Sequence, residues 1–360
     1  MIRQKRCPLI NPRFYEALVH AANGLKLLGL HARLRKSQIR SFAPILVYHR
    51  VGDLAHPWSL VPTSISAEVF EQQIKYMCHT YRILPLDQLV WLLREKQSPP
   101  QRVAAITFDD GYKCIHRTVY PILKKYDLPA KVFLPTSFIE TGKLFWWDTV
   151  GYAIHHARLT SIHLGKIGRF LLQSRHQRSK VASVVVNKLK HIPDQEKREL
   201  IDALVRQADV EIPTDLGKEL ILSWQEIKEM AEYGVTFGAH TCSHTVLTQI
   251  PTKQAREEIQ RSKERIEEML GRPVTAFAYP NGGPDDFNPE VIDLVKECGF
   301  TYAVTAIPRM AYPGADPYQL GRIMPEFKPE CTLDQFKLML LASQTYTDMV
   351  ALMARVKGRR

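Results

Sequence analysis

The segment "RVAAITFDDGY" (102–112) constrains the fold of this chain more than any other. Its first part is an almost unbroken apolar run, which is typical of a strand covered on both faces in a parallel sheet. Two adjacent aspartates, Asp109 and Asp110, follow this run. Because successive side chains of a strand point to opposite faces and like charges repel, something at the strand end must hold both carboxylates.

Short apolar runs alternate with helical patterns along most of the chain, which predicts an α/β fold with a parallel sheet and helices outside it. We expect a distorted (β/α) barrel of about seven strands. The predicted strands cover 44–51, 102–108, 130–135, 235–240, 274–280, 302–306 and 320–324. The predicted helices cover 68–81, 118–128, 223–234, 252–271 and 288–299. Residues 143–222 interrupt the alternation and predict a helical insertion between two barrel strands.

The formal net charge of +12 belongs to the two ends of the chain. Residues 1–40 hold nine Lys or Arg and one acid, and residues 351–360 hold four Lys or Arg and no acid. The neutral body argues against a nucleic-acid groove. We predict a basic N-terminal helical segment (1–42), a barrel with its insertion (43–330), and a C-terminal helix with a basic tail (331–360).

The segment 14–36 has the pattern of a basic amphipathic helix, which either packs on the domain or lies on an anionic membrane surface. The chain contains no apolar run of about 18 residues, so we expect no spanning helix. The N-terminus lacks the apolar stretch of an export signal. Six scattered cysteines without a CxxC motif indicate a reducing compartment. These features together predict a cytoplasmic protein, with peripheral contact at the inner face of the membrane as a further possibility.

Candidate metal ligands also follow a second predicted strand. His240 ends the strand 235–240, and His244 comes four residues later. If the chain turns helically after His240, both imidazoles share one face, and two His with one carboxylate form an open catalytic zinc set. One aspartate would then bind the ion and the other would stay free to take a proton from water. An HxxxH spacing alone often occurs by chance, and a DDG triplet alone is usually a turn. Because each follows an apolar strand here, a metal site is favoured.

Three motifs resemble those of one protein family. "TFDDGY", "HTCSH" and "FAYPNGG" are similar to motifs of the polysaccharide deacetylases, also called NodB-homology or carbohydrate esterase family four proteins. The resemblance covers about 44–142 and 223–325. It implies a distorted (β/α) barrel, a divalent metal ion that we expect to be Zn²⁺, and removal of acetyl groups from glycans.

The resemblance also implies roles for individual residues. Asp109 matches the catalytic base, and the backbone around Tyr279 and Pro280 matches the loop that helps to hold the oxyanion. The residues that match the metal ligands are Asp110, His240 and His244.

The general acid departs from the usual family pattern, because the chain has no His after His244. His49 ends the first predicted strand, as a similar His does in exopolysaccharide-type deacetylases. We expect His49 to be the acid, and the alternative is a buried His bonded to a backbone carbonyl.

Two further assignments are less constrained by the motifs. The arginine that usually precedes the third motif's proline is missing, and Arg322 could instead pair with Asp109, or else be an ordinary surface residue. Trp147, with Trp146 and Asp148, could form a sugar-binding wall in the insertion or simply pack its core.

The sequence thus predicts a metal-dependent hydrolase that removes N-acetyl groups from a polysaccharide or lipid-linked saccharide. A non-catalytic glycan-binding relative would explain the missing arginine and C-terminal His, but it would not need the base Asp109. A membrane-surface scaffold using the basic ends is the third alternative.

The basic N-terminal segment generates a test. Deleting residues 1–40 should abolish binding to anionic vesicles, because nine of the basic residues are removed with one acid. Co-sedimentation with vesicles at low and high salt measures this. Equal binding by the full and the truncated chains would contradict the prediction.

Overall fold

The computed structural model describes residues 42–52, 58, 64–97, 101–190, 192–325 and 332–357. The predicted helix at 14–36 and the basic tail at 358–360 lie outside the described residues, so membrane contact through the N-terminus stays a proposal. No helix within the described part of the chain is both long and apolar enough to cross a membrane.

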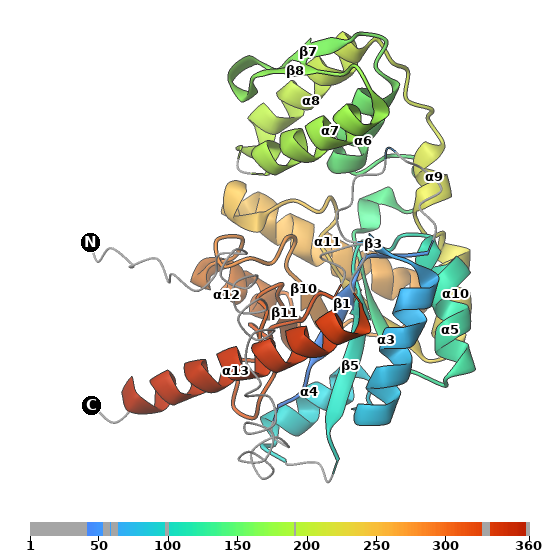
Figure 1. The fold of residues 1–360 in the computed structure, drawn as a ribbon. Coiled ribbons are helices and arrows are strands. Elements are labelled where there is room, and N and C mark those ends of the chain that lie inside the picture. Colours follow the sequence, from blue (N-terminus) through green and yellow to red (C-terminus); the bar gives the residue numbers. More distant parts are fainter. Residues whose placement is uncertain are drawn as a thin grey trace.

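A seven-stranded parallel sheet forms the centre of the molecule, which confirms the predicted α/β barrel architecture (Figure 1). Its order is β1-β5-β6-β9-β10-β11, and β4 also pairs with β5. The strands are β1 (Ile45–Tyr48), β4 (Arg82–Ile83), β5 (Val103–Phe108), β6 (Ala130–Leu134), β9 (Val235–Ala239), β10 (Ala276–Ala278) and β11 (Tyr302–Val304). All six residues of β5 are buried, as expected for a strand covered on both faces.

The segment 320–323 joins the two edges of this sheet. Leu320 N–H donates to the Ala303 carbonyl at 3.1 Å, and Val47 N–H donates to the Ile323 carbonyl at 2.9 Å. We predicted a full strand at 320–324, but the segment makes only isolated bridges, to β11 through Leu320 and to β1 through Ile323. These bonds still complete the ring of backbone between β11 and β1.

The first predicted strand, 44–51, is divided in two. β1 ends at Tyr48, and β2 (Arg50–Val51) pairs with β3 (Ser64–Ile65) instead of continuing in the main sheet. His49 therefore lies where the chain leaves the barrel.

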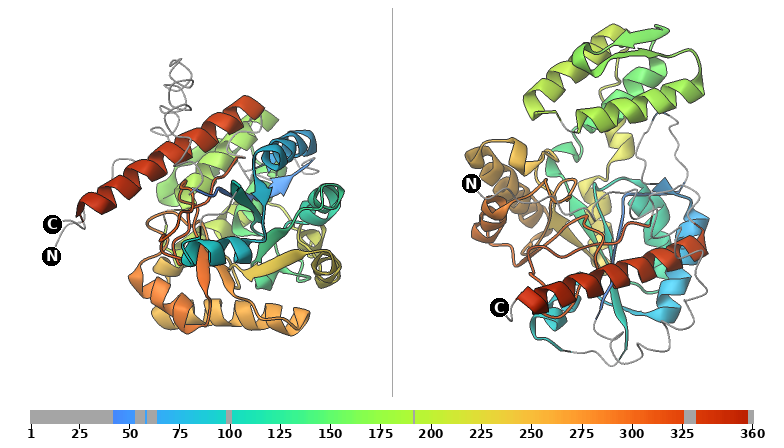
Figure 2. Two further views of the ribbon diagram at one scale, coloured as in Figure 1. Left: turned by 90° about the horizontal axis from the view of Figure 1, so that it is seen from below. Right: turned by 60° about the vertical axis from the view of Figure 1, so that its left-hand side comes forward.

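Helices surround the sheet (Figure 2). They are α3 (Ala67–Thr80), α4 (Leu86–Arg94), α5 (Tyr120–Lys125), α10 (Trp224–Glu232), α11 (Thr252–Leu270) and α12 (Pro289–Glu297), with α13 (Leu333–Lys357) following the barrel. A short π-helical turn, η3 (Ile115–Val119), precedes α5. The helix α11 is highly charged, but Ala255, Ile259 and Ile266 lie on one side of it and are buried, which fixes its inner face.

The segment between β6 and β9 holds the predicted insertion. It contains α6 (Trp146–His156), β7 (Ser161–His163), β8 (Arg169–Leu171), α7 (Arg175–Leu189), α8 (Asp194–Ala208) and α9 (Leu216–Leu220). Figure 1 shows most of it as a separate green layer above the barrel. We did not predict the antiparallel hairpin of β7 and β8, because both strands are only three residues long.

Candidate active site

The structure explains how two adjacent aspartates end β5. Asp109 still belongs to the sheet, because its N–H donates to the Tyr48 carbonyl at 2.9 Å. Asp110 has φ +68°, in the left-handed region, and it turns the chain away from the strand direction. Both side chains are buried, with 3% of each residue exposed. Each carboxylate therefore needs its own partners.

Asp110, His240 and His244 come together as a group that fits a metal ion. Asp110 Oδ1 lies 3.7 Å from His240 Nε2 and 3.3 Å from His244 Nε2. All three residues are buried, and one ligand atom from each lies within 4.8 Å of the others. Asp110 Oδ1 is buried and has no hydrogen-bond partner among the described residues. A buried, unpartnered carboxylate oxygen facing two imidazole nitrogens is the donor set that a divalent cation requires.

The protonation of the two imidazoles suits the same role. Nδ1 of His240 lies 2.8 Å from the Ala278 carbonyl, so this nitrogen carries the proton and leaves the Nε2 lone pair facing Asp110. Burial lowers the pKa of His240 to about 4 and lowers that of His244 well below its usual value. Both rings are therefore neutral at pH 7, as metal ligands must be.

The predicted helical turn after His240 is wrong. Residues 240–246 form a loop, and Thr241 and His244 have φ of +62° and +56°. The loop, and not helical periodicity, brings the rings to a centroid distance of 4.7 Å.

Arg322 forms a bidentate ion pair with Asp109. Its Nη1 donates to Asp109 Oδ1 at 2.7 Å, and its Nη2 donates to Asp109 Oδ2 at 2.6 Å. Nε of Arg322 donates to the Thr305 carbonyl at 2.9 Å, and 1% of the residue is exposed. Burial raises the pKa of Asp109, but the charge and the hydrogen bonds of Arg322 outweigh this effect, and the result is a pKa of about 2. Asp109 is therefore ionised, and Arg322 is not an ordinary surface residue.

His49 acts electrostatically on the same two carboxylates. Burial raises the pKa of Asp110 to about 7, and the strongest influence in the opposite direction is the electrostatic effect of His49. The same ring also lowers the pKa of Asp109 and that of His240. The half-buried His49 thus lies within electrostatic reach of the candidate metal ligands.

The family model for polysaccharide deacetylases matches residues 96–303, which is more than half of the chain. The chain belongs to the polysaccharide deacetylase family. It is accordingly an enzyme of carbohydrate deacetylation, which hydrolyses an amide bond.

Individual relatives agree with this assignment. A Bacillus subtilis (strain 168) protein provisionally named polysaccharide deacetylase YxkH is 22% identical over 281 residues, covering 78% of this chain and 70% of the relative. The poly-β-1,6-N-acetyl-D-glucosamine N-deacetylase of Staphylococcus aureus (strain MSSA476) is 40% identical over 80 residues, which are 22% of this chain and 26% of that enzyme.

Two solved structures share the fold. The Streptococcus pyogenes deacetylase PplD, in complex with acetate, has a TM-score of 0.56 at 19% identity and covers 84% of this chain and 98% of its own. IcaB from Ammonifex degensii has a TM-score of 0.54 at 19% identity and covers 84% of this chain and 97% of its own.

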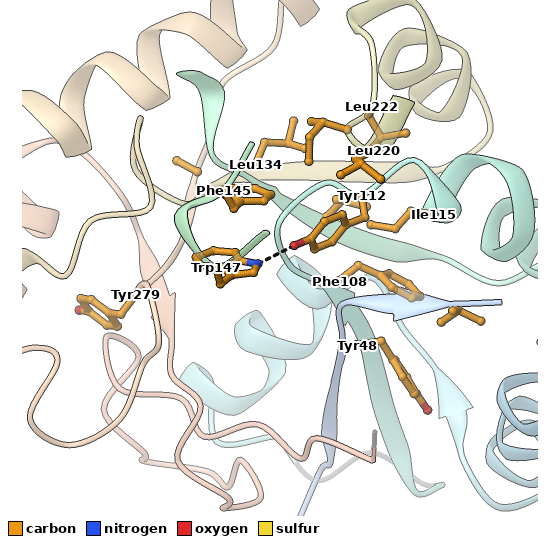
Figure 3. Packing of buried hydrophobic residues seen from close by; sticks show 14 of the residues in the cluster. Tyr48, Phe108, Tyr112, Ile115, Leu134, Phe145, Trp147, Leu220, Leu222 and Tyr279 are labelled. Atoms are coloured by element: carbon orange, nitrogen blue, oxygen red, sulfur yellow. Dashed lines mark hydrogen bonds between the residues drawn. The ribbon is translucent and has the colours of Figure 1, made fainter. Parts of the chain in front are cut away.

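Trp147 of the deacetylase is part of a polar network that sequence reasoning missed (Figure 3). Its indole N–H donates to the Tyr112 hydroxyl at 2.8 Å, and that hydroxyl donates to Asp148 Oδ2 at 3.0 Å. Arg50 donates to both oxygens of Asp148 at 3.2–3.3 Å and lies over the Tyr112 ring at 3.9 Å. Two features of the sequence could have indicated this network. Arg50 is adjacent to His49, and Tyr112 directly follows the DDG triplet.

This network ties the insertion to the candidate metal ligands. Trp147 stacks on Phe145 at 4.6 Å and contacts the edge of His244 at 4.8 Å between ring centroids. One face of the indole is therefore covered by Phe145, and the residue packs against a candidate ligand. These contacts show how Trp147 packs, and its sugar-binding role stays a prediction.

The insertion also places a lysine within electrostatic reach of the site. Lys190 follows α7, and burial lowers the pKa of its ammonium group, while the carboxylates of Asp286 and Asp110 act in the opposite direction. Asp286 belongs to the loop after β10. The end of α7 therefore lies within electrostatic reach of two loops that surround the candidate metal ligands.

Tyr279 lies beside the site, but its N–H and its hydroxyl both already donate hydrogen bonds to the protein. Its N–H donates to the Val304 carbonyl at 3.2 Å, and its hydroxyl donates to the Tyr318 carbonyl at 3.0 Å. Pro280 has no N–H. Figure 3 shows the Tyr279 ring apart from the Trp147 network. The oxyanion role of this backbone stays a prediction.

The Asp109–Arg322 pair generates a stability test. Arg322→Met should lower the free energy of unfolding by about 3–5 kcal/mol, because it leaves a buried carboxylate without its counter-ion. Adding Asp109→Asn should recover much of this loss, since the unpaired charge is then gone. Denaturant unfolding of the wild type, both single variants and the double variant measures the coupling. Additive losses would contradict a direct buried pair.

Proposed function

We propose that the protein is a metal-dependent hydrolase that removes N-acetyl groups from a polysaccharide or a lipid-linked saccharide. One observation carries the proposal: a buried Asp–His–His group lies beside a second aspartate that an arginine keeps ionised. The name of the S. aureus relative supports an N-acetylated amino-sugar polymer as the substrate class.

The proposed cofactor is one divalent ion, zinc by preference, held by Asp110, His240 and His244. When bound, such an ion would polarise the amide carbonyl and favour ionisation of a water molecule nearby. Imidazole nitrogens and a carboxylate oxygen are the ligands that zinc prefers in open catalytic sites.

The protein side chains supply the proton transfers. Asp109 accepts a proton from water as the water oxygen bonds to the acetyl carbon, and Arg322 keeps Asp109 ionised for this step. The C–N bond then breaks, and the amine nitrogen takes a proton from protonated His49. The products are acetate and a free amino sugar. Donors aimed at the developing oxyanion would stabilise it before the bond breaks.

Acetate release tests the proposal directly. The protein should release acetate from N-acetylated glucosamine oligomers, lose this activity with a chelator, and regain it with Zn²⁺. Asp109→Asn should still bind metal, but turnover should fall by about 10²–10⁴-fold, the usual contribution of a general base. Glycan binding without acetate release would instead support the non-catalytic relative.

The role of His49 generates a second test. His49→Ala should strongly slow hydrolysis of an amide, because an amine leaving group must be protonated before it departs. An activated aryl ester should be much less affected, since its leaving group is stable without a proton. The ratio of the two kcat/KM losses is the measurement. Equal losses for both substrates would show that His49 is not the acid.

A further inference from the structure

The loop that carries both histidine ligands has an unusual backbone. Thr241 and His244 both have positive φ values, a conformation that residues other than glycine adopt at an energetic cost. Such a conformation persists only where the surrounding structure holds it. Because the loop is not helical, contacts other than helical hydrogen bonds must hold it.

Glu258, on α11, binds the loop from one side. Its Oε2 accepts hydrogen bonds from the N–H groups of Cys242 and Ser243, both at 2.8 Å. Its Oε1 accepts a third from the Ser243 hydroxyl at 2.8 Å. One carboxylate therefore accepts three bonds from two consecutive residues located between His240 and His244. Hydrogen bonds to an ionised acceptor are about twice as strong as neutral ones.

The other side of the loop is bonded to the barrel. The carbonyl of Cys242 accepts from the Ser137 N–H at 2.9 Å, and the carbonyl of Thr241 accepts from the Thr136 N–H at 3.3 Å. The strand β6 ends at Leu134, and Thr136 and Ser137 come immediately after the next residue, Pro135. The loop is thus held between a rigid strand end and the Glu258 carboxylate.

The helix that carries Glu258 is itself well anchored. The adjacent Ile259 has no exposed surface, and Ala255, one turn earlier, is 1% exposed. Because buried residues fix the position of α11 against the barrel, its carboxylate is a fixed point and not a mobile surface group. Glu258 belongs to none of the three recognised motifs.

We infer that Glu258 is a positioning residue for the metal centre: it holds the 241–245 loop in the conformation that directs His240 and His244 at one ion. This inference rests on the proposed metal site. Among the described residues, the Glu258 side chain forms hydrogen bonds only with the loop, so its effect should appear in metal affinity before any effect on proton transfer. Loss of contacts that orient metal ligands typically weakens metal binding by about 10–100-fold.

The test is a Co²⁺ titration of the chelator-treated protein, with the visible absorption of bound Co²⁺ as the readout. Glu258→Ala should weaken Co²⁺ affinity by about 10–100-fold. Glu258→Gln should lie between Ala and wild type, because its amide oxygen can still accept from the two backbone N–H groups. The control is Glu257→Ala, an exposed neighbour on α11 that should bind Co²⁺ as the wild type does.

Thermal unfolding of the metal-free variants separates positioning from general stability. Weakened Co²⁺ binding in Glu258→Gln, at an unchanged metal-free melting temperature, supports the inference. If Glu258→Ala does not fold, Glu258→Gln and Ser243→Ala carry the test, each removing part of the same contact. Unchanged Co²⁺ affinity in the Glu258 and Ser243 variants would overturn it. Absence of Co²⁺ binding by the wild type would instead overturn the proposed metal site itself.

Discussion

The buried ion pair between Asp109 and Arg322 is the interaction on which the rest of the site depends. It joins the end of β5 to the segment that connects β11 with β1, two parts of the chain that are 213 residues apart in sequence. The desolvation of both groups is offset only while the pair is intact. The same contact therefore ties this connecting segment to the end of β5 and keeps a carboxylate ionised beside the candidate metal ligands.

The two adjacent aspartates have opposite environments, and this difference separates their proposed roles. Arg322 lowers the pKa of Asp109 to about 2, while burial raises that of Asp110 to about 7. Pairs of groups with pKa values pushed apart in this way are common where an acid–base function is divided between residues. Asp109 is already paired with the Arg322 cation. Asp110 has a buried oxygen without a hydrogen-bond partner in the described part of the chain, and this oxygen is the proposed metal ligand.

Sequence patterns predicted the parts of this site that lie within short segments. The apolar run before Asp109 and the strand before His240 identified two strand ends, and parallel strands bring such ends together. The spacing of His240 and His244 predicted shared metal binding for a partly wrong reason, since the loop between them is not helical. Its true support, Glu258, lies on the following helix, and only the three-dimensional structure shows that contact.

The contacts made by the insertion were also beyond sequence reasoning. The network of Arg50, Tyr112 and Asp148 joins three separate segments, and no periodicity or motif links them. The sequence also did not predict β4 or the hairpin of β7 and β8, because these strands are too short to give a clear alternating pattern.

We propose that one ion is held by Asp110, His240 and His244, while Asp109 does not bind it. A crystal structure of the Zn²⁺-loaded protein, with anomalous data at the zinc edge, tests it most directly. We expect a single peak about 2.0–2.2 Å from an Asp110 oxygen and from Nε2 of both histidines. We also expect that Asp109 stays paired with Arg322. A zinc ion bound by Asp109, or located away from these three residues, would contradict the account.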